Sequence, residues 1–110
     1  MNVENGVTLR KIRSFIRRQG RLTSAQEYAL THYWDIYCLD STQSHDFKKV
    51  FANDAPLLLE IGFGNGEALA KMAADNLDKN FIGIEVHKPG IGHLLLLLQQ
   101  QGLTNVRIFL

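Results

Sequence analysis

The residues most able to bind a ligand are an acid and three glycines that follow a short apolar run. Residues 57–66 read Leu-Leu-Leu-Glu-Ile-Gly-Phe-Gly-Asn-Gly. Glycine lets the backbone turn sharply and approach a ligand with no Cβ in the way, and a following helix points its free N–H groups at the same space. A second acid, Glu85, ends the apolar run 81–85. The pattern predicts a cofactor-binding turn formed by Glu60, Gly62, Gly64, Gly66 and Glu85.

The spacing of the glycines separates two classes of cofactor. A dinucleotide fingerprint places its third glycine three positions after the second, and that position is Glu67 in this chain. The third glycine comes one residue early, at Gly66, and Glu60 stands two residues before the first. A carboxylate repels a pyrophosphate and attracts a cation. The charge pattern therefore favours S-adenosyl-L-methionine, which carries a sulfonium and an ammonium group, over NAD. The alternative is a tight turn that needs glycine without binding a ligand.

Glu85 stands where a ribose would lie in either class of cofactor. Its two carboxylate oxygens can accept hydrogen bonds from both ribose hydroxyls, and charge-assisted bonds of this kind contribute roughly 1.5–3 kcal/mol each. The alternative is a solvated carboxylate at the end of a strand. The 25 residues from Glu60 to Glu85 match about one strand–helix–strand unit.

The second half of the chain alternates strands and helices. The expected strands are 57–61, 80–86 and 105–110, and the expected helices are 66–76 and 90–101. Asn76 and Gly102 stand where helices often end. Unbroken apolar strands that alternate with helices indicate an α/β fold with a parallel sheet and helices on both faces. A doubly wound domain usually has more than three strands. We therefore expect the chain to be the N-terminal part of a larger domain, with missing strands supplied from elsewhere as the alternative.

The first half is expected to be a helical extension over residues 1–52, with the α/β domain over 53–110. Apolar and basic side chains take opposite faces of a helix over 9–19. Ser24–Glu27 matches a capping box for a second helix that ends near 34–37. A short helix is expected around 47–51.

Charge is distributed unevenly along the chain. Residues 1–21 hold six bases and one acid, a net charge of +5, and the remaining residues hold a net charge of −4. A basic arm on a mildly acidic body indicates a polyanionic partner. The side chains that could grip RNA phosphates are Arg10, Arg13, Arg17, Arg18 and Arg21. The alternative is a solvated amphipathic helix packed on the body.

The remaining reactive residue types form no pattern of their own. Cys38 is the only cysteine, which excludes an internal disulfide and suggests a reducing compartment. The four histidines lack metal-ligand spacing, so no metal is expected. The sequence shows neither a signal peptide nor a membrane span. These features predict a cytoplasmic protein that does not bind membranes, and we expect a monomer.

Three segments resemble bacterial tRNA (guanine-N7-)-methyltransferases. They are Leu-Glu-Ile-Gly-Phe-Gly-Asn-Gly (59–66), Phe-Ile-Gly-Ile-Glu-Val-His-Lys-Pro-Gly (81–90) and the leader Arg-Ser-Phe-Ile-Arg-Arg-Gln-Gly-Arg-Leu-Thr (13–23). The resemblance implies a Rossmann-like class I fold, truncated here after the third strand, and methyl transfer from S-adenosyl-L-methionine to N7 of a guanine in tRNA. It also implies that Glu60 and Glu85 bind the cofactor and that catalytic residues lie beyond Leu110, none being assigned within this chain.

Other functions are compatible with the same residues. A methyltransferase of another substrate would bind the cofactor without depending on tRNA. A catalytically inactive remnant would bind RNA through the basic arm and transfer no methyl group. An NAD enzyme is the least favoured, because Glu67 occupies the third glycine position of its fingerprint.

Overall fold

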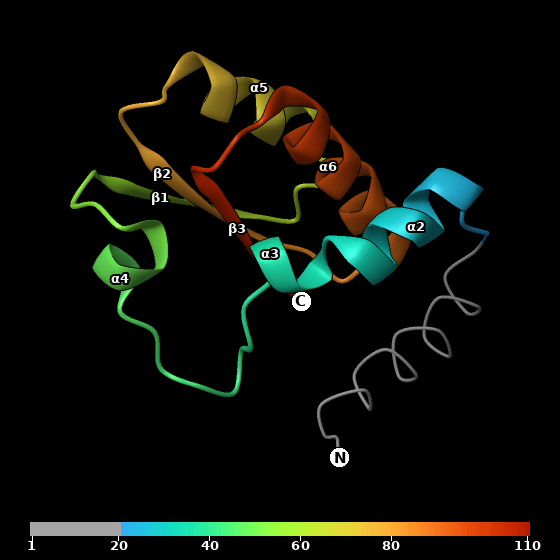
Figure 1. Ribbon diagram of the computed structural model, residues 1–110, viewed down its shortest axis with the longest axis horizontal. Coiled ribbons are helices and arrows are strands. Elements are labelled where there is room, and N and C mark those ends of the chain that lie inside the picture. The colour runs from blue at the N-terminus through green and yellow to red at the C-terminus, as the bar shows by residue number, and fades with distance from the viewer. Residues whose placement is uncertain (1–20) are drawn as a thin grey trace.

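A parallel three-stranded sheet forms the centre of the computed structural model, which describes residues 21–110. The strand order is β1 (Leu57–Ile61), β2 (Asn80–Ile84) and β3 (Val106–Phe109), with β2 in the middle (Figure 1). All pairs are parallel, as the alternation of strands and helices predicts. The expected helix over 9–19 lies outside the described residues, as do Arg10, Arg13, Arg17 and Arg18.

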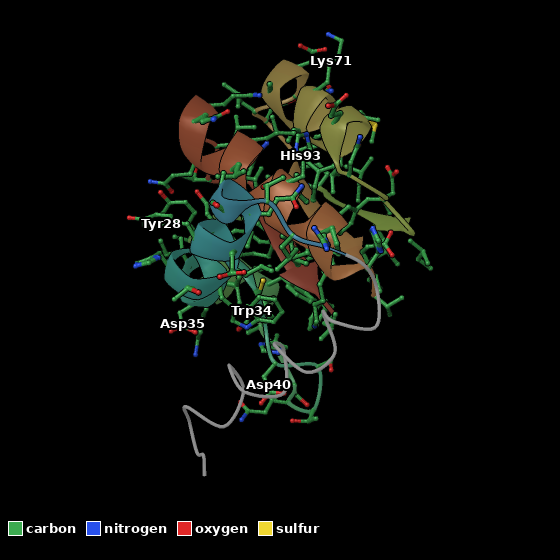
Figure 2. The ribbon with its side chains drawn as sticks, turned by 90° about the vertical axis from the view of Figure 1, so that its right-hand side faces the viewer. Tyr28, Trp34, Asp35, Asp40, Lys71 and His93 are labelled. Carbon is green, nitrogen blue, oxygen red and sulfur yellow. The ribbon has the colours of Figure 1, made fainter. Side chains whose placement is uncertain are left out.

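Two helices connect the strands and cover one face of the sheet. Helix α5 (Glu67–Asp75) runs from β1 to β2, and α6 (Lys88–Gln101) runs from β2 to β3. Helix α2 (Ser24–His32) packs on α6, while α4 (Phe47–Phe51) lies on the other side of the sheet (Figure 1). The short helix α3 (Trp34–Tyr37) follows α2. In the view of Figure 2, α2 lies in front of α6.

The hydrophobic core lies between α6 and the sheet. The leucine run of α6 is buried at Leu94, Leu95 and Leu98. Ala29 and Leu30 of α2 belong to the same core. The described part of the N-terminal half therefore shares its core with the strands and helices that follow it.

The sequence predicts a helix in the place of α2 but misplaces both of its ends. The expected helix ending near 34–37 is divided at Tyr33 into α2 and α3. Thr23, and not Ser24, is the N-cap: its hydroxyl accepts a hydrogen bond from the Gln26 N–H at 3.0 Å, and the Gln26 side chain accepts one from the Thr23 N–H at 3.1 Å. Thr23 has the extended backbone that an N-cap needs, whereas Ser24 is already helical. The capping box thus begins one residue earlier than predicted.

Strands β2 and β3 are shorter than predicted because polar side chains take over at their ends. β2 stops at Ile84, since the next residues turn their N–H groups toward the Glu85 carboxylate. β3 starts after Asn105, which is buried. The Asn105 amide donates to the carbonyl oxygens of Ala73, Asn76 and Lys79, at 3.0, 3.2 and 3.0 Å. Asn105 thus ties the start of β3 to the end of α5.

β1 is an edge strand with apolar side chains on its surface. Leu59 is 61% exposed and Ile61 is 74% exposed. Apolar side chains on an unpaired edge are unusual in a complete sheet. The exposed edge agrees with the expectation of a sheet truncated after its third strand. Within residues 21–110, no helix combines the length and the apolar character needed to cross a membrane.

Candidate functional site

The loop over residues 62–66 leaves the carboxyl end of β1 and enters α5. Gly62, Gly64 and Gly66 have φ of +73°, +66° and +79°, a region that disfavours other residues. Gly66 is also the N-cap of α5, and a Cβ there would lie 2.6 Å from the Cβ of Leu94. The sharp turn and the contact with α6 therefore both require glycine at position 66.

Glu85 follows β2 and holds this loop through its side chain. The Gly64 N–H donates to Oε1 of Glu85 at 2.7 Å, and the N–H groups of Val86 and His87 donate to Oε2 at 2.9 and 3.1 Å. The Gly62 N–H also donates to the carbonyl oxygen of Ile84 at 2.7 Å. We call loop 62–66 together with Glu85 the loop–acid junction.

The environment of Glu85 keeps its carboxylate ionised. Partial burial acts to raise the pKa of Glu85, but the three backbone N–H groups and His87 lower it, and the net pKa lies below its ordinary value. A carboxylate offers about four lone-pair positions, and three backbone bonds leave capacity for a further donor. The junction can thus present a fixed negative charge to a hydroxyl-bearing or cationic ligand.

Two other predicted residues lie apart from this junction. Glu60 is half-buried near the end of β1, opposite Gly83 in the sheet register, and has no hydrogen bond to the junction within residues 21–110. Arg21 is exposed in the segment before α2. The structure therefore brings Gly62, Gly64, Gly66 and Glu85 together, with Glu60 on the adjacent strand.

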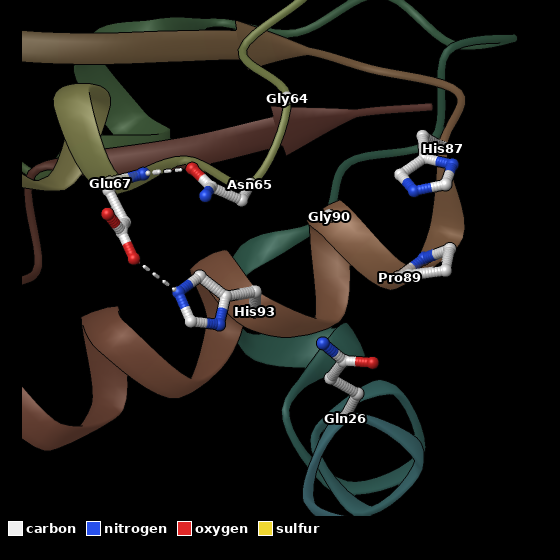
Figure 3. A pocket seen from close by; sticks show the side chains of 8 residues that line it. All are labelled: Gln26, Gly64, Asn65, Glu67, His87, Pro89, Gly90 and His93. Atoms are coloured by element: carbon white, nitrogen blue, oxygen red, sulfur yellow. Dashed lines mark hydrogen bonds and ion pairs between the residues drawn. The ribbon is translucent and has the colours of Figure 1, made fainter. Parts of the chain in front are cut away.

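An open pocket of about 400 Å³ adjoins the junction on the side of α2. Figure 3 shows that it lies between the glycine loop, the start of α6 and Gln26 of α2 (Figure 3). Its lining residues are Gln26, Gly64, Asn65, Glu67, His87, Pro89, Gly90 and His93. Gly64 is the only one of the predicted cofactor residues that lines this pocket.

A histidine–carboxylate contact crosses the pocket between two helices. His93 Nε2 on α6 lies 3.1 Å from Oε2 of Glu67, the first residue of α5. The Asn65 side chain accepts a hydrogen bond from the Glu67 N–H at 3.0 Å. These contacts hold the start of α5 to α6 on the side of the loop that faces the pocket (Figure 3). The described residues contain no group of three or more side chains that could hold a metal ion.

The sequence matches the protein family described as "Putative methyltransferase" over residues 54–110, which is half of the chain and includes the whole junction. The chain belongs to this methyltransferase family. The predicted family and the α/β fold class are both confirmed.

Several curated relatives of this methyltransferase chain have the same name. The chain is 56% identical over 100 residues to the tRNA (guanine-N(7)-)-methyltransferase of Methylococcus capsulatus. This match covers 91% of the chain and 43% of that protein. The chain is 49% identical over 106 residues to the proteins of the same name from Escherichia coli K12 and Shigella flexneri, over 96% of this chain and 44% of theirs. The chain spans less than half of the length of these relatives.

Sequence patterns alone do not indicate several residues of the candidate site. Glu67 contacts His93, which is 26 positions away in the chain. Gly90 packs against the glycine loop, although it belongs to no local ligand-binding pattern. The repeated glycines of α6 are the signal that could have found it, because glycine is unfavourable inside a helix unless something approaches closely.

Proposed function

We propose that this chain is the cofactor-binding part of an S-adenosyl-L-methionine-dependent methyltransferase that modifies N7 of a guanine in tRNA. The observation that carries the proposal is the loop–acid junction, found in a chain that matches proteins named tRNA (guanine-N(7)-)-methyltransferase over at least nine-tenths of its length. The proposal divides the chain into an extension over 1–52 and a cofactor domain over 53–110. It also implies a cytoplasmic location, where the tRNA substrate is found.

The residues at the junction fit the proposed cofactor. Glu85 keeps accepting capacity for ribose hydroxyls, and its depressed pKa keeps it ionised at neutral pH. Two of the loop glycines, Gly62 and Gly64, would meet nothing within 4 Å if a Cβ were present, so the loop faces open space at these positions. Glu60 supplies a second carboxylate at the end of β1 for the ammonium group. We assign Glu60, Gly62, Gly64, Gly66 and Glu85 to cofactor binding.

The proposed reaction requires no general acid or base from this chain. When bound, the cofactor supplies an electrophilic methyl group on a sulfonium. Guanine N7 carries a lone pair and no proton, so its attack needs no general base in principle. The contribution of residues 1–110 is to bind and orient, which places the reacting atoms in line. We assign no catalytic residue to this chain and place such residues beyond Leu110.

Calorimetric titration with two ligands tests the proposal. S-adenosylmethionine should bind the chain, and NAD should not, because the carboxylates of the site repel its pyrophosphate. Binding of NAD without binding of S-adenosylmethionine would contradict the cofactor assignment. A transfer assay with unmodified tRNA, read out as N7-methylguanosine, tests the substrate, and a methyl group placed on another base or another substrate would contradict it.

The basic arm is proposed to contact tRNA phosphates through Arg10, Arg13, Arg17, Arg18 and Arg21. Replacing Arg13 and Arg17 together with alanine should weaken tRNA binding and reduce the slope of log K against log [salt] by roughly 2, since each phosphate contact releases about one counterion. Filter binding from 50 to 300 mM salt, compared with the matched Lys48→Ala and Lys49→Ala double variant on α4, measures the change. An unaltered salt slope would count against the arm.

A further inference from the structure

Gly90 lies in the first turn of α6 and packs directly against the glycine loop. A Cβ at Gly90 would stand 2.0 Å from the carbonyl oxygen of Gly64 and 2.9 Å from its carbonyl carbon. Real Cβ atoms essentially never come within 3.0 Å of another heavy atom. Because the obstacle is backbone and not a flexible side chain, any residue larger than glycine at position 90 must displace the loop.

The loop is therefore held from two sides. On the side of β2, the N–H of Gly64 donates to Glu85 at 2.7 Å and the N–H of Gly62 donates to Ile84 at 2.7 Å. On the side of α6, the carbonyl group of Gly64 rests against the bare Cα of Gly90. Both contacts come from one short segment, since α6 starts three residues after Glu85. The segment 84–90 thus acts as a cradle for Gly64.

We propose that Gly90 is a positioning residue of the cofactor site. Its missing side chain sets the distance between α6 and the loop, and this distance places the Gly64 N–H on the Glu85 carboxylate. A loop pushed away from α6 would lengthen the 2.7 Å hydrogen bond between Gly64 and Glu85. It would also change the direction of the loop and the orientation of the Glu85 lone pairs that remain for a ligand. The effect on cofactor affinity rests on the proposed function, whereas the effect on the Gly64–Glu85 bond does not.

Gly92 provides a matched control two residues farther along the same helix. A Cβ at Gly92 would lie 3.0 Å from the Cβ of Gln26 on α2 and 3.1 Å from the Gln26 carbonyl oxygen, and its three nearest atoms all belong to Gln26. The two substitutions to alanine raise the helix propensity of α6 equally. Gly90→Ala requires the loop to move, whereas Gly92→Ala presses on α2. The clash at Gly92 is the milder, since its shortest distance is 3.0 Å against 2.0 Å at Gly90.

The test compares Gly90→Ala with Gly92→Ala in the isotope-labelled chain by amide NMR and by calorimetry. In the unchanged protein, the Gly64 amide proton should resonate downfield and shift when Glu85 is protonated at low pH, because a short bond to a carboxylate deshields it. Gly90→Ala should move this resonance upfield, remove its response to Glu85 and weaken S-adenosylmethionine binding at least tenfold. Gly92→Ala should leave the resonance in place and change the affinity by less than about threefold.

A Gly64 resonance that stays in place and keeps its pH response in folded Gly90→Ala would overturn the proposal. Weakening of the affinity by both variants equally would also overturn it. If the unchanged chain binds no S-adenosylmethionine, the proposed function fails, and the Gly64 resonance still decides the positioning role. Should Gly90→Ala not fold, the unchanged protein gives the test: nuclear Overhauser contacts between the Gly90 α-protons and the backbone protons of Gly64 or Asn65 are expected, and their complete absence would overturn the proposal.

Discussion

Replacing Glu85 with alanine should weaken S-adenosylmethionine binding about 100-fold, which corresponds to about 2.7 kcal/mol. Two losses combine in this variant. The cofactor loses a carboxylate acceptor for its ribose hydroxyls, and charge-assisted hydrogen bonds contribute roughly 1.5–3 kcal/mol each. The loop also loses the acceptor of the Gly64 N–H, which the structure places at 2.7 Å from Oε1. Isothermal calorimetry of the two proteins at pH 7 measures the difference.

Two variants that each remove one negative charge separate the hydrogen-bonding role of Glu85 from a general effect of charge on binding. Glu85→Gln keeps the size of the side chain but sets an amide N–H against backbone donors, so it should lose about tenfold in affinity. Asp78→Asn removes the same charge before β2, at the opposite end of that strand, and should bind like the unchanged chain. Equal affinity of Glu85→Gln and the unchanged chain would remove the proposed role.

The same carboxylate gives the stability of the chain a pH dependence of known sign. The pKa of Glu85 in the folded chain lies below its ordinary value, so the folded state holds its proton less tightly than the unfolded state does. The stabilisation is therefore present above about pH 4.3, the ordinary pKa of glutamate, and is lost as the pH falls through the folded pKa. The difference in unfolding free energy between Glu85→Gln and the unchanged chain should shrink over this range.

The order of the strands and helices from β1 to β3 could be predicted because each has its own periodicity. β1 is found at 57–61 as expected, and α5 and α6 end at Asn76 and Gly102, the C-cap residues that the sequence indicates. The glycine loop could also be predicted, because its signal is local in the sequence. Positive φ at three alternate positions is a property of the turn itself.

What the sequence could not show depends on contacts between distant residues. The position of Glu85 after a predicted strand makes its carboxylate a candidate for binding ribose. Its hydrogen bond with Gly64, 21 positions away, forms only in the folded loop. Helix α6 starts at Lys88, two residues before the predicted start at residue 90, and Pro89 in its first turn is the local signal for this earlier start. The shortened ends of β2 and β3 likewise follow from side chains that bond across the fold.

Lys88 is the clearest case of tertiary structure overriding a local expectation. A lysine at the start of a helix is ordinarily solvated, yet Lys88 is 1% exposed and its Nζ lies 5.1 Å from the centre of the Trp34 ring. Burial lowers the pKa of Lys88 to about 8, with a smaller opposing effect from Cys38. Burial raises the pKa of the Cys38 thiol, which Lys88 lowers in turn.

Replacing Lys88 with methionine should therefore change how stability depends on pH. Below pH 8 both the folded and the unfolded state hold the lysine proton, so Lys88 gives stability no pH dependence there. Between pH 8 and about 10.5, the folded state releases this proton while the unfolded state keeps it, so Lys88 makes the folded state more stable as the pH rises. The unfolding free energy of Lys88→Met minus that of the unchanged chain should fall by about 3 kcal/mol from pH 7 to 10.5.

Because Cys38 also titrates in this pH range, the effect of Lys88 is measured as the difference in unfolding free energy between variants and not from the pH curve of one protein. Its raised pKa has the opposite sign: the unfolded thiol ionises near pH 8.5 while the buried thiol keeps its proton, so stability falls as the pH rises. In the unchanged chain the two effects oppose each other between about pH 9 and 10.5, and the Cys38→Ala variant should reveal the rise in stability that Lys88 causes. Lys71→Met, which removes an exposed lysine of α5 (Figure 2), should follow the unchanged chain. Urea unfolding at intervals of half a pH unit measures all four proteins, and parallel curves for Lys88→Met and Lys71→Met would show that Lys88 titrates as an ordinary surface lysine.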